Sequence, residues 1–300
     1  ISISPKAQQQ NSMMKKTYYL FALVFIVMIN QSTFSQTILP FHLVDGYILI
    51  DAKVNDKQGK FLFDTGTHTN FMLNNNLIDL DKNTFVANGT AGSGQKLTVY
   101  KSTIKNITIK NSTIEFNEIE NVMHTNFKFM QDSIASDILG TIGYQFMKDY
   151  VVTIDYNRQI IKLDDKLQSN NSKLIVSLPY SNLNNYPEVV FQTKNKKNIY
   201  AYFDTGSLGA IMFTKSKFEE LIQEEYVKIY NQNAWYGIRK EQFKTYKIED
   251  LKLKNKPFHI ENIYFIESDK NKISLGYSFL KNYISVWDFQ NKMIYLYENK

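Results

Sequence analysis

The chain has 300 residues, of which 43% are hydrophobic and 14% are aromatic, and its formal net charge is +6. With 12 glycines and 5 prolines, this composition excludes a low-complexity or fibrous protein, and the length is sufficient to bury a core. The absence of cysteine excludes disulfides, a thiolate nucleophile and a thiolate metal site. The lysines are interleaved with Asp and Glu, which indicates a solvated surface and not a nucleic-acid-binding one.

The N-terminal part predicts a secretory signal peptide over residues 13–35. Residues 13–16 form a short basic region, residues 18–29 a continuous apolar run, and residues 33–35 a small-x-small cleavage signature. The apolar run is too short to be a comfortable membrane span, although an uncleaved N-terminal anchor is the alternative interpretation. Residues 1–12 precede a start methionine, so we interpret them as an upstream, non-mature segment. Without this leader, which holds three of the 35 basic residues and none of the 29 acidic ones, the formal net charge is +3.

The first half of the mature chain predicts several short strands. Residues 47–54 and 61–63 are apolar runs separated by Asn-Asp-Lys-Gln-Gly, which is a hairpin turn signal. Residues 97–116 alternate between apolar and polar side chains in short stretches, as half-buried strands do. The many β-branched and aromatic residues also favour strands over helices.

The second half predicts a similar series of strands and one clear helix. The runs EVVFQT (188–193) and IYAYF (199–203) flank a turn that is rich in Lys and Asn. Residues 215–230 place apolar side chains at helical spacing with acids between them, which predicts a helix. Residues 164–172 are polar and rich in chain-breaking residues, which is typical of a joint between two halves.

Each half ends in a repeated segment. Residues 142–163 and 275–296 are identical at eight of 22 positions, and both begin with an apolar residue followed by Gly-Tyr-x-Phe. An Asp-Thr-Gly phrase precedes the shared glycine by 79 residues in the first half and by 72 in the second. We therefore interpret the chain as a duplicated domain, with an N-terminal lobe over residues 36–168 and a C-terminal lobe over residues 169–300.

The two Asp-Thr-Gly phrases predict a site built from paired carboxylates, those of Asp64 and Asp204. Two carboxylates that face each other at about 3 Å cannot both ionise, so they share one proton. The ionised member can take a proton from a water held between them, while the protonated member polarises a carbonyl. Such a pair splits an amide without a covalent intermediate and without a metal.

The residues that follow each aspartate have predicted supporting roles. We expect the threonines to hydrogen-bond across the pair, the glycines to bring backbone N–H groups close to the carboxylates, and the last hydroxyl of each turn to reach an outer carboxylate oxygen. These residues are Thr65, Gly66 and Thr67 in the first turn, and Thr205, Gly206 and Ser207 in the second.

The phrases FLFDTGT and AYFDTGS, together with the paired TIGYQFM and SLGYSFL, resemble the aspartic peptidases and in particular their retropepsin-like branch. The resemblance covers nearly all of residues 45–300. It implies a mainly β fold with a few short helices, in which two homologous β-barrel lobes are related by a pseudo-twofold axis and the active site lies between them. It also implies that Asp64 and Asp204 are the catalytic dyad, and that the apolar-Gly motifs at Gly143 and Gly276 shield the active-site turns.

The same resemblance implies how the protein acts. It is expected to be an aspartic-type endopeptidase that hydrolyses peptide bonds with an activated water and uses no cofactor and no metal. Its expected partner is a peptide or protein substrate. We expect no nucleic-acid partner and no stable membrane insertion after signal cleavage. A periplasmic or secreted monomer is expected, with a dimer as the variant.

The resemblance further implies a β-hairpin flap beyond each aspartate. Residues 88–94 and 233–237 are turn-like at the corresponding distance. The first is rich in glycine and lacks an aromatic, whereas the second carries two aromatics that fit an ordinary sheet equally well. The flap and substrate-binding candidates are Gly92, Ser93, Gly94, Trp235, Tyr236 and Gly237.

The main alternative is a catalytically inactive protein with the aspartic-peptidase fold that binds peptides without cleaving them. Residues 89–96 are a poor match to a phosphate-binding loop, because Gln95 separates Gly94 from Lys96 and no helix is expected to follow. The four histidines have no metal-like spacing, and His68, four residues beyond Asp64, is the one placed to line a substrate pocket.

Overall fold

The computed structural model describes most of the chain after the expected leader. The described residues are 36–80, 84–181, 187–193, 196, 198–209, 212–213, 227–236, 239–254, 256–265 and 274–299. The chain divides into two units, residues 1–35 and 36–300, and all described residues belong to the second. The predicted upstream segment and signal peptide, residues 1–12 and 13–35, therefore lie outside the described residues. Within the described ranges, no helix is long and apolar enough to cross a membrane.

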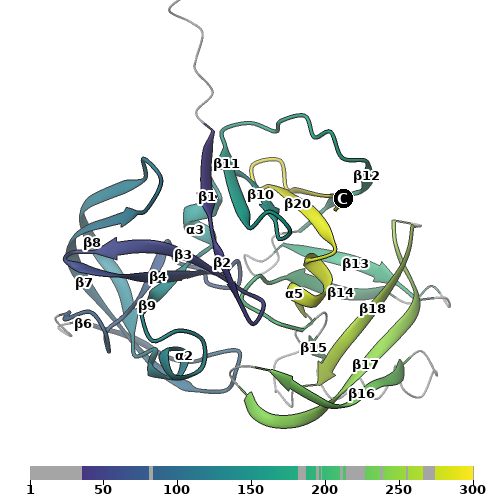
Figure 1. Cartoon of the computed structure of the whole chain (residues 1–300), viewed down its shortest axis with the longest axis horizontal. Helices are drawn as coiled ribbons and strands as arrows, with labels where there is room; N and C mark the ends of the chain where they lie inside the picture. The colour runs from purple at the N-terminus through teal and green to yellow at the C-terminus, as the bar shows by residue number, and fades with distance from the viewer. Residues whose placement is uncertain are drawn as a thin grey trace, which may run out of the picture. The chain divides into compact units, whose positions relative to one another are not determined.

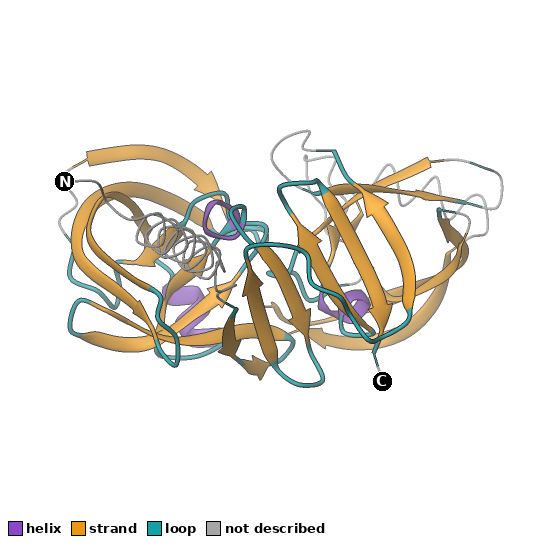
Figure 2. Ribbon diagram, turned by 90° about the horizontal axis from the view of Figure 1, so that it is seen from above, coloured by secondary structure: helices purple, strands orange, loops and turns teal. Residues whose placement is uncertain are grey.

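The described chain is mostly β, which confirms the expected fold class at this coarse level (Figure 2). Its helices are short: α2 (Lys128–Ser133), α3 (Tyr144–Met147) and α5 (Tyr277–Leu280). Among the described residues the strands form three sheets. One sheet comes from the first half of the chain, one from the second half, and one from both (Figure 1).

The first-half sheet has eight strands in the described chain and curls on itself, because β3 pairs with both β4 and β7. Tight turns set its register. Asp45 and Gly46 both have positive φ and connect β2 to β3, and Asn55, with φ 49°, begins the turn from β3 to β4. In spatial order the strands are β2 (His42–Val44), β3 (Tyr47–Val54), β4 (Lys57–Phe63), β9 (Ile138–Ile142), β5 (Phe71–Asn74), β8 (Glu115–Thr125), β7 (Lys96–Ile109) and β6 (Thr84–Thr90).

The second-half sheet repeats this order strand for strand, without a counterpart of β2 among its named strands. It also curls, because β13 pairs with both β14 and β17. The parallel pairs recur at the same places: β4 with β9 and β5 with β8 in one sheet, β14 with β19 and β15 with β18 in the other. In spatial order the strands are β13 (Glu188–Gln192), β14 (Asn198–Phe203), β19 (Ser274–Leu275), β15 (Met212–Phe213), β18 (Lys256–Phe265), β17 (Arg239–Leu253) and β16 (Val227–Tyr236).

The shared sheet takes three strands from each half. Its centre is the antiparallel pair of β10 and β20, in which Thr153 pairs with Val286, its own counterpart in the sequence repeat. The flanking pairs, Val151 with Asp288 and Asp155 with Ile284, exchange counterparts in the same way. In spatial order the strands are β1 (Thr37–Pro40), β11 (Ile160–Asp164), β10 (Val151–Asp155), β20 (Tyr283–Asp288), β21 (Met293–Glu298) and β12 (Leu174–Pro179).

The predicted strands agree with these elements, whereas the predicted helix does not. Residues 47–54 are β3, residues 61–63 end β4, and the two runs of the second half fall in β13 and β14. The helix predicted over residues 215–230 is wrong at its C-terminal end, because residues 227–230 begin the long strand β16. Residues 215–226 of that prediction lie outside the described residues. Pairing with β17 decides the conformation of 227–230, since a strand bonded along its length overrides a local helical spacing.

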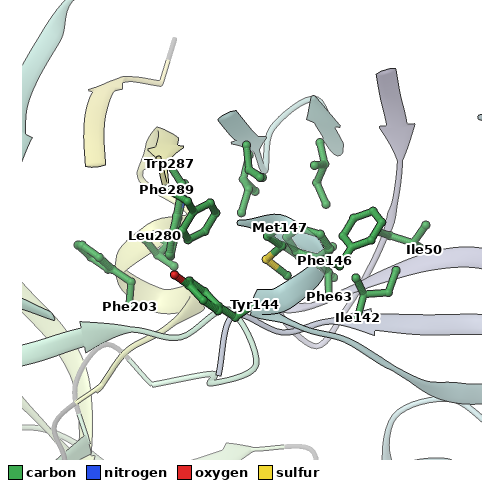
Figure 3. Packing of buried hydrophobic residues seen from close by; sticks show 14 of the residues in the cluster. Ile50, Phe63, Ile142, Tyr144, Phe146, Met147, Phe203, Leu280, Trp287 and Phe289 are labelled. Atoms are coloured by element: carbon green, nitrogen blue, oxygen red, sulfur yellow. The ribbon is translucent and has the colours of Figure 1, made fainter. Parts of the chain in front are cut away.

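One apolar core extends through both halves. Phe63, Ile142 and Phe146 from the first half and Phe203 and Trp287 from the second belong to the same buried cluster (Figure 3). The Trp287 ring packs edge-on against Phe203 at 5.6 Å between centroids. The core therefore includes the last residues of β4 and β14, and Asp64 and Asp204 come directly after these residues.

Candidate active site

Asp64 and Asp204 each follow the buried last residue of a strand, Phe63 of β4 and Phe203 of β14. The backbone N–H of Asp64 donates to the carbonyl of Ile142 at 2.9 Å, and that of Asp204 donates to the carbonyl of Leu275 at 3.0 Å. Because these carbonyls lie on β9 and β19, which run parallel to β4 and β14, each aspartate is fixed to its own sheet at the same point.

Thr65 and Thr205 join the two turns by reciprocal hydrogen bonds. The N–H of Thr65 donates to Oγ1 of Thr205 at 3.0 Å, and the N–H of Thr205 donates to Oγ1 of Thr65 at 3.1 Å. The hydroxyl of Thr65 donates to the carbonyl of Phe203 at 3.2 Å, and that of Thr205 to the carbonyl of Phe63 at 2.8 Å. Each threonine hydroxyl thus donates to a backbone carbonyl of the other half and accepts a bond from a backbone N–H of the other half. The two threonines are 1% and 0% exposed, so no water competes for these bonds.

The surroundings of Gly66 and Gly206 show that the two carboxylates converge. A Cβ atom built on Gly66 would lie 2.8 Å from Oδ1 of Asp204 and 2.9 Å from Oδ1 of Asp64, so both oxygens border one point. A Cβ atom built on Gly206 would lie 2.5 Å from Cγ of Asp64. Any side chain at either position would collide with a carboxylate, and this close approach is the reason for glycine.

Hydrogen-bond donors of each turn point at its own carboxylate. The N–H of Gly66 donates to Oδ1 of Asp64 at 2.7 Å, and the N–H of Gly206 donates to Oδ1 of Asp204 at 3.0 Å. The hydroxyl of Thr67 donates to Oδ2 of Asp64 at 2.8 Å. Each oxygen of Asp64 therefore accepts a bond from its own turn, which stabilises the ionised form of a carboxylate. Ser207, the counterpart of Thr67, is 5% exposed.

Gly143 and Gly276 lie behind the two turns, each directly before a short helix. After Gly143, the N–H of Tyr144 donates to the carbonyl of Thr67 at 2.7 Å. After Gly276, the N–H of Tyr277 donates to the carbonyl of Ser207 at 2.9 Å. A Cβ atom on Gly143 would lie 2.4 Å from the carbonyl oxygen of Thr67, and one on Gly276 would lie 2.1 Å from that of Ser207. These glycines let the start of each helix pack directly against the turn that follows the aspartate.

The first flap candidate is the tip of the β6–β7 hairpin. The N–H of Ala91 donates to the carbonyl of Gln95 at 2.9 Å, so Gly92, Ser93 and Gly94 form the turn between the strands. A Cβ atom on Gly92 or Gly94 would meet nothing within 4 Å, and every residue of β6 is exposed. The hairpin tip is therefore open to solvent among the described residues, and β6 is an edge strand of its sheet.

The second flap candidate differs from the prediction. Residues 233–236, including Trp235 and Tyr236, continue the strand β16 instead of forming a turn. The connection to β17 follows Tyr236, which pairs with Arg239. Gly237 lies in this connection and outside the described residues. β16, like β6, is the last strand of its sheet.

Sequence reasoning missed two buried hydroxyls behind the aspartate turns. Thr141, which is 3% exposed, donates to Oγ1 of Thr67 at 3.3 Å, and Ser274, which is 0% exposed, donates to Oγ of Ser207 at 3.5 Å. The two residues are equivalent in the sequence repeat, one position before the aligned segments begin. They are also the first residues of the paired phrases TIGYQFM and SLGYSFL, but nothing in those phrases indicates that their hydroxyls reach the aspartate turns.

The predicted pocket histidine, His68, is exposed on the turn after Asp64. A different histidine, His124, is 0% exposed and lies between Asn75 and Ser102, with each of its ring nitrogens 3.0 Å from a polar side-chain atom of these residues. Its ring also stacks on Tyr100 at 5.7 Å. His124 is thus a hydrogen-bonded core residue of the first-half sheet.

Over the described ranges, no three His, Asp or Glu side chains come together as a metal site. Comparison of the sequence with protein-family models and with curated proteins finds no match. The geometry of the two aspartate turns is accordingly the basis on which a function is assigned.

Proposed function

We propose that the chain is an aspartic endopeptidase in which Asp64 and Asp204 activate one water between them. The observation that carries the proposal is the convergence of the two carboxylates on one point beside Gly66. The turns that bear them are locked together through Thr65 and Thr205, so the carboxylates are held before substrate arrives. Such preorganisation is what positioned acid–base catalysis requires.

The chemistry follows from the proximity of the two acids. In the proposed mechanism one aspartate is ionised and the other protonated, the state that two neighbouring carboxyl groups favour because like charges repel. The ionised aspartate takes a proton from the bound water, and the water oxygen bonds to the carbonyl carbon of the peptide. The protonated aspartate gives its proton to the carbonyl oxygen, which forms a neutral diol. One aspartate then gives its proton to the amide nitrogen while the other takes a proton from a diol hydroxyl, so that the C–N bond breaks and leaves a carboxylic acid, an amine and a pair that again holds one proton.

The proposal includes the two-lobed arrangement of the aspartic peptidases. Its support is the repeated strand order of the first-half and second-half sheets and the symmetric pairing of Thr153 with Val286 between them. A pseudo-twofold axis through that pair relates Asp64 to Asp204, so each lobe supplies one catalytic acid.

The proposed substrate is an extended peptide or protein segment. The edge strands β6 and β16 belong to hairpins at corresponding positions, and each leaves one side without a partner strand among the described residues. An edge strand offers a row of backbone donors and acceptors to which an extended chain can add. The signal-like leader over residues 13–35 supports export of the enzyme to the periplasm or beyond the cell, and a monomer suffices because both acids come from one chain.

The test is replacement of either acid by its amide. Asp204→Asn and Asp64→Asn each remove one ionisable member and keep the side-chain shape, so we expect kcat/KM for a peptide library to fall by at least about a hundredfold. Asp165→Asn, on the exposed segment between the halves, is the matched control and is expected to cleave like the wild type. Circular dichroism verifies that all three variants are folded.

The results separate this proposal from the inactive peptide-binding alternative. Retained cleavage in Asp204→Asn would reject the catalytic assignment. Peptide binding without turnover by the wild type, measured by calorimetry over the same pH range, would favour the binding protein.

A further inference from the structure

Thr141 and Ser274 are polar residues in surroundings that favour apolar ones. Thr141 lies in β9, of which all five residues are buried, and Ser274 opens β19, of which both residues are buried. Burying a hydroxyl costs free energy unless it is hydrogen-bonded. Both hydroxyls point to the same kind of partner, the hydroxyl of the residue that follows an Asp-Thr-Gly phrase.

The direction of these bonds follows from the number of protons available. A threonine hydroxyl has one proton to donate and two lone pairs that accept. Thr67 donates its proton to Oδ2 of Asp64 at 2.8 Å, so its oxygen can only accept from Thr141 at 3.3 Å. The three groups form a chain in which Thr141 donates to Thr67 and Thr67 donates to the carboxylate.

We propose that Thr141 and Ser274 are positioning residues of the two aspartate turns: Thr141 holds the hydroxyl of Thr67 so that its proton stays directed at Asp64, and Ser274 holds the hydroxyl of Ser207 in the equivalent place. This inference rests on the proposed function and gives a role to the first residue of each of the paired phrases TIGYQFM and SLGYSFL. An accepted hydrogen bond polarises Thr67 and strengthens the bond it donates. Because a hydroxyl donates a stronger hydrogen bond to an ionised carboxylate than to a protonated one, we expect Thr141 to affect the pH dependence of catalysis as well as the position of the turn.

The corresponding hydrogen bonds of the two halves differ in length. The bond from Ser274 to Ser207 is 3.5 Å long, at the limit of a hydrogen bond, whereas that from Thr141 to Thr67 is 3.3 Å. Thr141 is therefore expected to have the larger effect.

The described titratable groups near the pair include Tyr156, Tyr277 and His68. Asp204 faces Asp64 across Gly66. Burial, followed by Tyr277 and Asp204, raises the pKa of Tyr156, so this residue stays neutral where the aspartates titrate. His68 is exposed on the turn itself. None of these groups is altered by the substitutions below.

The experiment compares the pH dependence of kcat/KM in variants of the whole chain. Thr141→Val keeps the β-branched shape and removes the hydroxyl, and we expect the acid limb to move up by about 0.5 pH unit, a loss of about threefold in kcat/KM on that limb and a smaller loss on the plateau. Thr141→Ser retains the hydroxyl and is expected to restore the acid limb. Thr153→Val makes the same chemical change at the centre of the shared sheet, where the counterpart is already Val286, and is the control with the wild-type profile.

The outcomes are distinct. An acid limb in Thr141→Val that superimposes on the wild type, or an equal loss at every pH, would overturn the inference and leave Thr141 a structural residue. If Thr141→Val does not fold, Ser274→Ala decides, with a shift in the same direction and of smaller size expected. If the wild type cleaves no peptide at any pH, the proposed function fails, and the titration of the Asp64 carboxyl followed by ¹³C NMR in the wild type and Thr141→Val then tests the hydroxyl chain alone.

Discussion

Tyr156 carries a hydroxyl that its counterpart in the repeat, Phe289, lacks. Both side chains are buried, with exposures of 4% and 5%. The ring of Tyr156 packs against that of Tyr277, and the ring of Phe289 packs against that of Tyr144, in both cases at 5.4 Å between centroids. The Tyr156 hydroxyl has no hydrogen-bond partner among the described residues. A buried hydroxyl without a partner destabilises the folded state.

Tyr156→Phe is therefore expected to raise the free energy of unfolding by about 1 kcal/mol, because it removes a desolvated hydroxyl and keeps the ring. Urea denaturation at neutral pH measures the change. Phe289→Tyr is the matched reverse substitution and is expected to lower stability by about 1–3 kcal/mol. A lower urea midpoint for Tyr156→Phe would mean that the hydroxyl is hydrogen-bonded in solution.

The same residue makes the fold sensitive to alkali. Burial, with smaller contributions from Tyr277 and Asp204, raises the pKa of Tyr156 above its ordinary value of 10.0. In the unfolded chain the phenol ionises at its ordinary pKa, whereas in the folded chain it stays neutral, so the folded state is unaffected by this group below pH 10 and loses stability relative to the unfolded state as the pH rises further. Unfolding at pH 7 and at pH 11 should show a smaller alkaline loss in Tyr156→Phe than in the wild type, and equal losses would contradict the argument.

The elements that shape the site are the short helices α3 and α5 and the glycines before them. Each helix has four residues and begins where the N–H of its first tyrosine binds the carbonyl of an aspartate turn. Such a short helix has little stability of its own, so packing against the turn maintains it. Gly143 and Gly276 make that contact close.

Gly143→Ala is expected to lower the free energy of unfolding by about 2 kcal/mol and to reduce peptidase activity. Its Cβ would lie 2.3 Å from the carbonyl oxygen of Thr69 and 2.4 Å from that of Thr67, and neither backbone atom can move without displacing the turn that bears Asp64. Gly89→Ala is the control, since a Cβ there meets nothing within 4 Å, and it is expected to change stability by less than about 0.5 kcal/mol. Equal thermal midpoints of the two variants would show that the turn relaxes freely.

The shared sheet makes the two halves dependent on each other. Separating them would cut the pairing of β10 with β20 and leave each as an edge strand. It would also divide the apolar core, in which Tyr144 of the first half packs against Phe289 of the second at 5.4 Å between ring centroids. The chain is consequently a single cooperative structure, even though its sequence reads as two similar parts.

Residues 36–168 and 169–300, produced separately, are therefore expected to be unfolded or to associate through their exposed strands, whereas their co-expression restores a folded pair. Circular dichroism and gel filtration measure folding and association. Peptidase activity in the mixture, and in neither part alone, is the expected functional result. A stable, active monomer of either half would contradict both the shared core and the two-acid site.

The sequence by itself determined the features that depend on neighbours along the chain. Alternating and apolar runs predicted β3, β13 and β14, because side-chain period and turn residues act over a few positions. The duplicated segments predicted two copies of the same series of elements, and strand order repeats between the two sheets. The residues of both aspartate turns were also identified from the repeated phrase alone.

Only the tertiary structure decided which distant residues meet. The bonds between Thr65 and Thr205 span 140 positions, and the contact of Thr141 with Thr67 spans 74. The conversion of residues 227–230 from an expected helix to β16 likewise depends on the partner strand β17. Such contacts form when whole sheets close on each other, and a local pattern carries no information about which side chain will lie opposite.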